Sequence, residues 1–221
     1  MSMRHTIILT SLFFFLSFTA SAQQSITPDL HKAAKHDKIK VYNRALTLVN
    51  EEGYQGIRLS KDYGEGVAWM KGITFSTGTL EFDVRGENLK QHSFVGMAFH
   101  GQNDSTYDAV YLRPFHFYAA DQISQDRMIQ FISLPVFTWR KLRAESPGQF
   151  EHRIVPPPDP NAWVHVRIEV TASTITTFIN GSSTPSLVVY PIAPLTAGKV
   201  GFYVADTSGG DFANLKITPT K

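Results

Sequence analysis

Two acidic side chains in the segment Gly78–Arg85, of sequence GTLEFDVR, have residue types and a spacing that could serve catalysis. Glu81 and Asp83 alternate with apolar residues, so in a β-strand both side chains would point to the same face, about 7 Å apart at the backbone. Two such carboxyl groups can act as the general acid and the base in glycoside hydrolysis. The alternative is an ordinary solvent-exposed face, on which these carboxylates pair with Arg85 or with Arg113 of a neighbouring strand.

Polar and aromatic residues gather in a second region, residues 93–117, of sequence SFVGMAFHGQNDSTYDAVYLRPFHF. Two alternating runs flank a polar turn, and their period of two predicts strands with one apolar face and one more polar face. The polar face carries small residues, which leave a shallow trough, and then His100, Tyr111 and Arg113. A guanidinium can bind vicinal hydroxyls or a carboxylate through its planar fork, and aromatic rings offer flat faces. The pattern predicts a binding surface for a polar, flat-faced ligand such as a sugar.

Nine residues are candidates for ligand binding, because they occupy the non-core register of a predicted strand or lie beside the ends of these strands. They are Glu81, Asp83, Arg85, His100, Tyr111, Arg113, His116, Gln130 and Trp139. For each aromatic residue and histidine, the alternative is an ordinary position in the core or on the surface. The histidines could also ligate a metal or form an acid–base pair, but their spacing matches no compact metal motif. No residue is assigned as catalytic.

The segment DTSGGD, from Asp206 to Asp211, could bind a structural calcium ion through carboxylate and carbonyl oxygens. The alternative is a hairpin turn between two strands, because the same residue types favour tight turns. The sequence contains no nucleotide-binding loop, no G-x-S-x-G elbow and no H-E-x-x-H motif. We therefore expect no organic cofactor, and calcium is the metal that the sequence suggests.

The candidate residues must be positioned by β-strands, because strand-like runs bounded by turn residues fill the chain after residue 44. Strands are predicted at 45–49, 56–59, 66–70, 78–85, 94–100, 109–113, 128–133, 163–171, 174–180, 186–190, 198–205 and 212–217. About a dozen short strands predict an all-β protein, a two-sheet antiparallel jelly-roll β-sandwich that spans residues 45–221. The predicted core contains Leu80, Phe82, Val84, Val95, Met97, Phe99, Val110, Leu112, Ile168, Val170, Phe178, Val200, Phe202 and Leu215.

Two stretches interrupt the strand pattern between residues 135 and 160. The first, PVFTWRKLRAESPGQFE, carries Trp139 and several cationic residues, and we expect a short helix at about 139–144. The second, RIVPPPDP, is rich in proline, which cannot donate hydrogen bonds to a strand ladder. Long loops in compact domains are usually functional or disordered. The aromatic residues favour an ordered lid or rim over the edge of the sandwich.

Several segments together resemble the concanavalin A-like lectin/glucanase superfamily, the jelly rolls that include laminin-G-like domains and many carbohydrate-binding modules. The matching segments are GTLEFDVRG, SFVGMAFHG, AVYLRPF, WVHVRIEVTASTITTFING and the closing KVGFYVADTSGGDFANLKI. The resemblance covers nearly all of the chain after the N-terminal segment and implies a jelly-roll fold, often with a structural calcium ion. It does not define an activity, because binding modules, hydrolases and lyases share this fold.

The chain departs from the enzyme branches of this superfamily. Glu81, Phe82 and Asp83 are followed by Val-Arg-Gly, so the E-x-D-x-x-E strand of laminarinase-like hydrolases is absent. The arginine-rich and Q-I-H strands of jelly-roll alginate lyases are absent too. Secreted bacterial proteins of this general appearance are sometimes grouped with keto-disaccharide hydrolase-like domains, for which the chain shows no defining motif.

The N-terminus predicts export. Arg4 and His5 precede the apolar run IILTSLFFFLSF, and small residues follow up to Ala22, which is typical of a secretory signal peptide cleaved after that residue. We therefore expect residues 1–22 to be a Sec-type signal peptide, residues 23–44 to be a basic segment, and the protein to be periplasmic or secreted. The basic cluster HKAAKHDKIK at 31–40 is expected to be a solvated linker or a short helix.

Charge and cysteine content limit the possible partners. The formal net charge is +2, which provides no electrostatic footprint for nucleic acid, and no second hydrophobic stretch predicts a membrane segment after the signal peptide. The chain has no cysteine, so an exported domain must be held together by its core alone, which favours a bacterial source. We expect a monomer.

The leading hypothesis from the sequence is a secreted, non-catalytic carbohydrate-binding domain that acts on a polysaccharide or oligosaccharide. The first alternative is a glycoside hydrolase or polysaccharide lyase that uses Glu81, Asp83 or the histidines. The second alternative is a laminin-G-like domain that binds another protein. The predicted site lies across strands 78–85, 94–100, 109–113 and 128–133 and is walled by the loop that carries Trp139.

Overall fold

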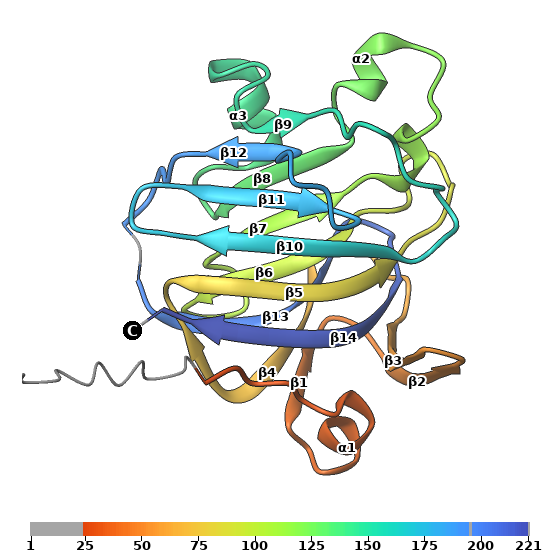
Figure 1. Cartoon of the computed structure of the whole chain (residues 1–221), viewed down its shortest axis with the longest axis vertical. Helices are drawn as coiled ribbons and strands as arrows, with labels where there is room; N and C mark the ends of the chain where they lie inside the picture. The colour runs from red at the N-terminus through yellow and green to blue at the C-terminus, as the bar shows by residue number, and fades with distance from the viewer. Residues whose placement is uncertain (1–23, 195, 221) are drawn as a thin grey trace, which may run out of the picture.

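The protein is a sandwich of two antiparallel sheets with seven strands each (Figure 1). The computed structural model describes residues 24–194 and 196–220. Sheet I has the strand order β1 (Ile39–Tyr42), β4 (Gly66–Phe75), β13 (Gly198–Val204), β6 (Val95–Gly101), β7 (Tyr107–Leu112), β8 (Ile129–Leu134) and β9 (Glu151–His152). Sheet II has the order β12 (Leu187–Val189), β11 (Ile175–Ile179), β10 (Val164–Val170), β5 (Gly78–Arg85), β14 (Gly210–Pro219), β3 (Tyr54–Leu59) and β2 (Leu46–Glu51).

Short helices lie at opposite ends of the sandwich. α1 (Leu30–Lys35) is at the bottom of Figure 1, whereas α2 (Gln122–Gln125) and α3 (Trp139–Glu145) are at the top. A 3₁₀ turn, η1 (Pro114–His116), follows β7. α3 is the helix expected in the excursion at 135–160, and it begins where the Thr138 side chain accepts a hydrogen bond from the Lys141 backbone N–H. No helix of the described residues is long and apolar enough to span a membrane.

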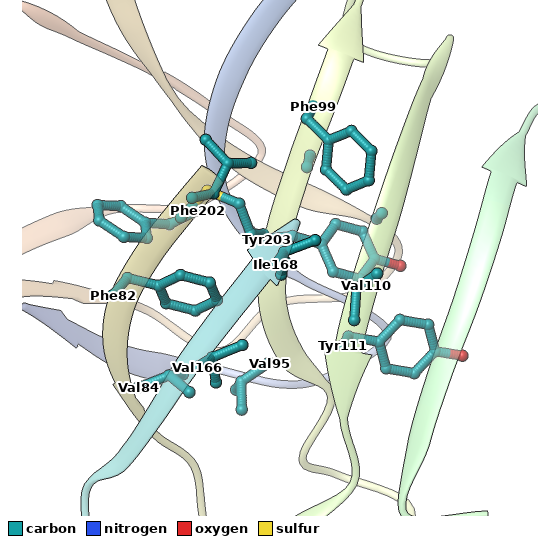
Figure 2. Packing of buried hydrophobic residues seen from close by; sticks show 14 of the residues in the cluster. Phe82, Val84, Val95, Phe99, Val110, Tyr111, Val166, Ile168, Phe202 and Tyr203 are labelled. Carbon is teal, nitrogen blue, oxygen red and sulfur yellow. The ribbon is translucent and has the colours of Figure 1, made fainter. Parts of the chain in front are cut away.

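Apolar residues alternate along the strands of sheet II and hold the two sheets together. In β5, Leu80, Phe82 and Val84 are fully buried, while the residues between them are partly exposed. The ring of Phe202 on β13 packs 6.2 Å from that of Phe82 and 4.7 Å from that of Phe212 on β14, so these aromatic residues bridge the sheets. Figure 2 shows the interior side chains from both layers meeting. Burial of apolar surface stabilises this arrangement by about 25 cal/mol for each Å² removed from water.

Sheet I differs from sheet II because β6, β7 and β8 are buried on both faces. One face packs against sheet II, so the other face must be covered by additional chain. The cover consists of the segment after β7 and the excursion that carries α3. Two contacts tie the cover to the sheet: Arg113, in the segment after β7, donates a hydrogen bond to Gln130 of β8, and Arg143 of α3 forms an ion pair with Glu151 of β9. The result is a hollow on the outer face of sheet I.

The predicted fold class and all twelve predicted strands are confirmed, with shifts of a few residues at their ends. Of the predicted core, only Phe178 is wrong. Its ring lies on the outer face of sheet II under the guanidinium of Arg167, 3.9 Å from the ring centroid, while Thr177 points inward. The alternation of Ile175, Thr177 and Ile179 decides which face is buried, and the size of the phenylalanine does not.

The N-terminal basic segment forms more structure than the sequence indicates. The short helix is α1, and its residues Leu30 and Ala33 are buried in the core. Strand β1 follows directly and pairs with β4 at the edge of sheet I, which the sequence did not predict. Strand β9, with two residues, was also not predicted. The expected signal peptide, residues 1–22, lies outside the described residues.

Candidate ligand-binding site

A cavity of about 630 Å³ opens on the outer face of sheet I; we call it the sheet I pocket. Its floor contains Tyr203 of β13 and Tyr111 of β7, which flank Gly96 of β6 in register. The two tyrosine rings lie 5.6 Å apart. A Cβ atom at Gly96 would lie 2.0 Å from the carbonyl oxygen of Val110, so only glycine allows this close approach. Figure 2 shows the hydroxyl ends of both tyrosines directed away from Phe82 of the interior.

At one end of the pocket, three guanidinium groups converge on one carboxylate. Glu151, 5% exposed, accepts hydrogen bonds at 2.7 and 2.5 Å from Arg143, and its carboxylate lies 3.3 Å from Nε of Arg127 and 3.4 Å from Nη1 of Arg113. We call these four residues the arginine cluster. All three arginines line the pocket. Charge-assisted hydrogen bonds of this type fix the orientation of the guanidinium planes.

Arg113 is held more tightly than the other arginines, because only 3% of it is exposed. Its Nη1 donates to the carbonyl of Arg127 at 2.9 Å, and its Nη2 donates to the Tyr111 hydroxyl and to Oε1 of Gln130, each at 3.0 Å. Gln130 is 1% exposed, and its amide nitrogen donates to the carbonyls of Phe131 and Phe150. Arg113 therefore belongs to a preorganised polar network beneath the pocket as well as to its lining.

The other end of the pocket holds a partly buried acid. Glu65 accepts a hydrogen bond from the hydroxyl of Tyr203. Burial raises the pKa of Glu65 above its usual value, although the Tyr203 hydrogen bond and the charge of Arg44 oppose this effect. Asp206, which also lines the pocket, raises it further. Glu65 therefore keeps its proton to a higher pH than an exposed glutamate does.

His116 lines the pocket as a neutral ring. Burial lowers its pKa to about 4, so the ring is uncharged at neutral pH. Its Nδ1 lies 3.1 Å from the carbonyl oxygen of Arg127. A carbonyl can only accept, so Nδ1 carries the proton and donates it, which leaves Nε2 as a hydrogen-bond acceptor. A neutral histidine in this tautomer can accept a hydrogen bond from a ligand hydroxyl.

Aromatic rings form the apolar part of the wall. Trp139 at the start of α3 is 37% exposed, and the guanidinium carbons of Arg140 and Arg143 lie 5.0 and 4.8 Å from its ring centroid. The rings of Phe94 and Phe115 meet edge to face at 5.4 Å. The pocket therefore combines apolar ring surface with fixed hydrogen-bonding groups, which is the composition of sites for small polar ligands.

The structure brings together five of the nine candidate ligand-binding residues. Tyr111, Arg113, His116 and Trp139 line the pocket. Gln130 lies beneath it and is bonded to Arg113. The expectation that the loop with Trp139 walls this face of the sandwich is confirmed at the level of geometry.

The prediction that Glu81, Asp83 and Arg85 share this face is wrong, because β5 belongs to sheet II. Their side chains form an ion-paired outer surface there. Asp83 lies 2.7 Å from Nδ1 of His165, and Glu81 accepts a hydrogen bond from Lys216 at 3.1 Å. Alternation assigned the correct face within β5 but carries no information on which sheet the strand joins.

The prediction that His100 lies on the polar face is also wrong. The backbone at His100 has φ of 56°, which interrupts the alternation of β6. The ring is 5% exposed and bonds through Nδ1 to Asp108 at 2.8 Å and through Nε2 to the carbonyl of Ser76 at 2.6 Å. It packs 4.9 Å from the ring of Phe99, a core residue. His100 therefore supports the interior rather than the pocket.

The expected calcium ligands do not fit a shared metal ion. Both oxygens of Asp211 accept hydrogen bonds from Arg58, and Arg85 donates to Oδ2 as well. Burial would raise the pKa of Asp211, but these arginines hold it below its usual value. Asp206 instead lines the sheet I pocket. Within residues 24–194 and 196–220, no group of three or more histidine and acidic side chains could hold a metal ion.

Sequence reasoning missed Glu65, Tyr203, Arg127 and Arg143 of the pocket lining, and Glu151 of the arginine cluster. Tyr203 carried a usable signal, because it alternates with the core residues Phe202 and Val204 and so has the register of Tyr111. Glu65 precedes a strand in a polar turn, and Glu151 lies in a strand of two residues. Neither position has a local pattern that indicates a pocket.

Comparison with known proteins identifies the fold. No protein-family profile matches the sequence, and no curated protein matches it. Among solved structures, the carbohydrate-binding module CBM66 from Bacillus subtilis is similar with a TM-score of 0.59 and 14% identity, over 81% of this chain and 95% of that one. The VIP36 exoplasmic/lumenal domain, in a Ca²⁺/Man3GlcNAc-bound form, has a TM-score of 0.57 and 9% identity, over 91% and 90%.

A Bacillus subtilis protein with a galectin-like fold has a TM-score of 0.55 and 14% identity, over 87% of this chain and 94% of that one. All three structures are jelly-roll sandwiches. The chain has the concanavalin A-like jelly-roll fold, as the resemblance implied. Identities this low define the fold alone, because many functions share one fold.

Proposed function

We propose that this protein is a secreted carbohydrate-binding domain and that the sheet I pocket holds the sugar. The observation that carries the proposal is the composition of the pocket. Exposed ring surface of Trp139 lies beside the guanidinium groups of Arg140 and Arg143 and beside His116, which can accept a hydrogen bond. Sugars present apolar C–H patches and rings of hydroxyls, and a site with both kinds of surface binds them.

Two further observations support this proposal. The similar folds include a carbohydrate-binding module and a lumenal domain in a Man3GlcNAc-bound form. The first 22 residues have the pattern of a signal peptide, which would deliver the domain to the periplasm or the medium, where polysaccharides occur.

Binding to a glycan array, followed by calorimetric titration of the tightest hit, tests the proposal. We expect Trp139→Ala to weaken binding at least tenfold, because it removes the most exposed ring of the pocket. Tyr190→Ala is the matched control, since Tyr190 is 73% exposed and does not line the pocket. If the folded wild-type protein binds none of the glycans, that result would favour the alternative of a laminin-G-like protein-binding domain.

A glycoside hydrolase is the second candidate function, and Glu65 is the residue that favours it. A carboxylic acid with a raised pKa, inside a pocket with a second carboxyl group at Asp206, is suited to protonate a glycosidic oxygen. Release of reducing ends from a bound glycan, abolished in Glu65→Gln, would support hydrolysis. Binding without product release in the wild-type protein would support the non-catalytic function.

A further inference from the structure

The charge of the sheet I pocket is unbalanced. Arg113, Arg127 and Arg143 share the single carboxylate of Glu151, so this cluster carries an excess of two positive charges. Glu151 is 5% exposed and already bonded to the arginines, and its single negative charge balances only one of their three positive charges. A charged side chain that is removed from water without an oppositely charged partner raises the free energy of the folded protein. A ligand that brings negative charge would relieve this cost.

Two more cations line the same pocket. Arg140 and Lys90 have no carboxylate partner among the residues that the structure describes, and Arg140 contacts the ring of Trp139 instead. His116 adds no charge at neutral pH. The five cations of the lining face Glu65, Asp206 and Glu151, so even with all three acids ionised two positive charges remain. The whole chain has a formal charge of only +2, so the pocket holds an unusual share of it.

We propose that the ligand is an acidic carbohydrate, whose carboxylate or sulfate group binds at the cationic end formed by Arg127, Arg140 and Arg143. This inference rests on the proposed function. A planar guanidinium matches a carboxylate or sulfate with two parallel hydrogen bonds. The sugar hydroxyls would face His116, which accepts, and the Glu65 end of the pocket. Uronate and sulfated sugars share this chemistry, and the experiment distinguishes them.

Calorimetric titration with three matched probes tests the inference. The probes are neutral galacto-oligosaccharides, oligogalacturonates and sulfated galactan oligosaccharides of equal length. We expect one of the two acidic probes to bind at least tenfold more tightly than the neutral probe. Because the attraction is electrostatic, this preference should shrink as the salt concentration rises. The tighter acidic probe identifies the group as carboxylate or sulfate.

A pair of charge-removal variants supplies the control. Arg140→Gln with Lys90→Gln removes two exposed cations that form no ion pair within the described chain, and it should reduce the acidic preference by about fivefold while the melting temperature stays the same. Lys35→Gln, in the last turn of α1, with Lys38→Gln, three residues further along the chain, removes the same charge and should change nothing. α1 lies at the opposite end of the molecule from α3 (Figure 1).

Two outcomes would overturn the inference, and they can be told apart. If the neutral probe binds as tightly as both acidic probes, the acidic specificity is wrong and the proposed function stands. If these probes and every glycan of a wider array fail to bind to the folded wild-type protein, the proposed function fails together with the inference.

Discussion

At the scale of single residues, Arg113 decides whether the pocket keeps its shape. Its guanidinium joins Tyr111, Gln130 and Glu151 from three strands. We expect Arg113→Ala to lower the free energy of unfolding by about 2–4 kcal/mol, because it leaves buried polar partners without a donor. Urea unfolding measures this loss. A change below about 1 kcal/mol would mean that Arg113 serves the ligand alone.

His116 provides a second prediction at this scale, with a defined pH window. Burial holds its pKa at about 4 in the folded protein, whereas an unfolded histidine titrates near its ordinary value of 6.5. Below pH 6.5 the unfolded state therefore binds more protons, so stability is present above that pH and is lost as the pH falls toward 4. Because the ring is only partly buried, we expect the loss to be about 1–2 kcal/mol.

His116→Asn is the matched variant, since its amide can still donate to the carbonyl of Arg127. Unfolding in urea at pH 7 and at pH 4.5 should show a smaller drop in the free energy of unfolding for the variant than for the wild type. An equal drop in both proteins would mean that another group titrates in this window.

At the scale of elements, the approach of β6 to β7 builds the floor of the pocket. Gly96→Ala would place a Cβ atom 2.0 Å from the carbonyl oxygen of Val110 and 2.6 Å from Cα of Tyr111. We expect a loss of about 3 kcal/mol in the free energy of unfolding and weaker glycan binding, because the strands must shift. Ala98→Gly, on the same face of β6, is the control variant and should lower the free energy of unfolding by about 1 kcal/mol. Equal effects would contradict this role for Gly96.

The elements also show what the sequence could predict. Alternation within a strand identified β5, β6, β7 and β8 and nearly all of the core, because burial of one face imposes a period of two. It could not show that β5 joins sheet II while β6 joins sheet I. That choice depends on pairing with β10 and β14, which are far away in the sequence. The candidate site therefore combined residues from two opposite surfaces.

At the scale of the whole molecule, the packed core between the two sheets supports the sheet I pocket. A ligand that binds only the folded state raises stability by about 2.7 kcal/mol at a concentration of 100 times its Kd. For a domain of this size we expect the melting temperature to rise by about 5–10 °C with the tightest glycan. Thermal unfolding with and without glycan checks this shift, and Trp139→Ala at the same concentration should show much less of it.

A crystal structure of the protein with its tightest glycan tests most directly whether the sheet I pocket binds sugar. We predict electron density for a sugar between Tyr111, His116 and Trp139, with an acidic group near Arg140. Density on the outer face of sheet II, over Glu81 and Asp83, or an empty sheet I pocket beside an ordered glycan elsewhere, would contradict the account.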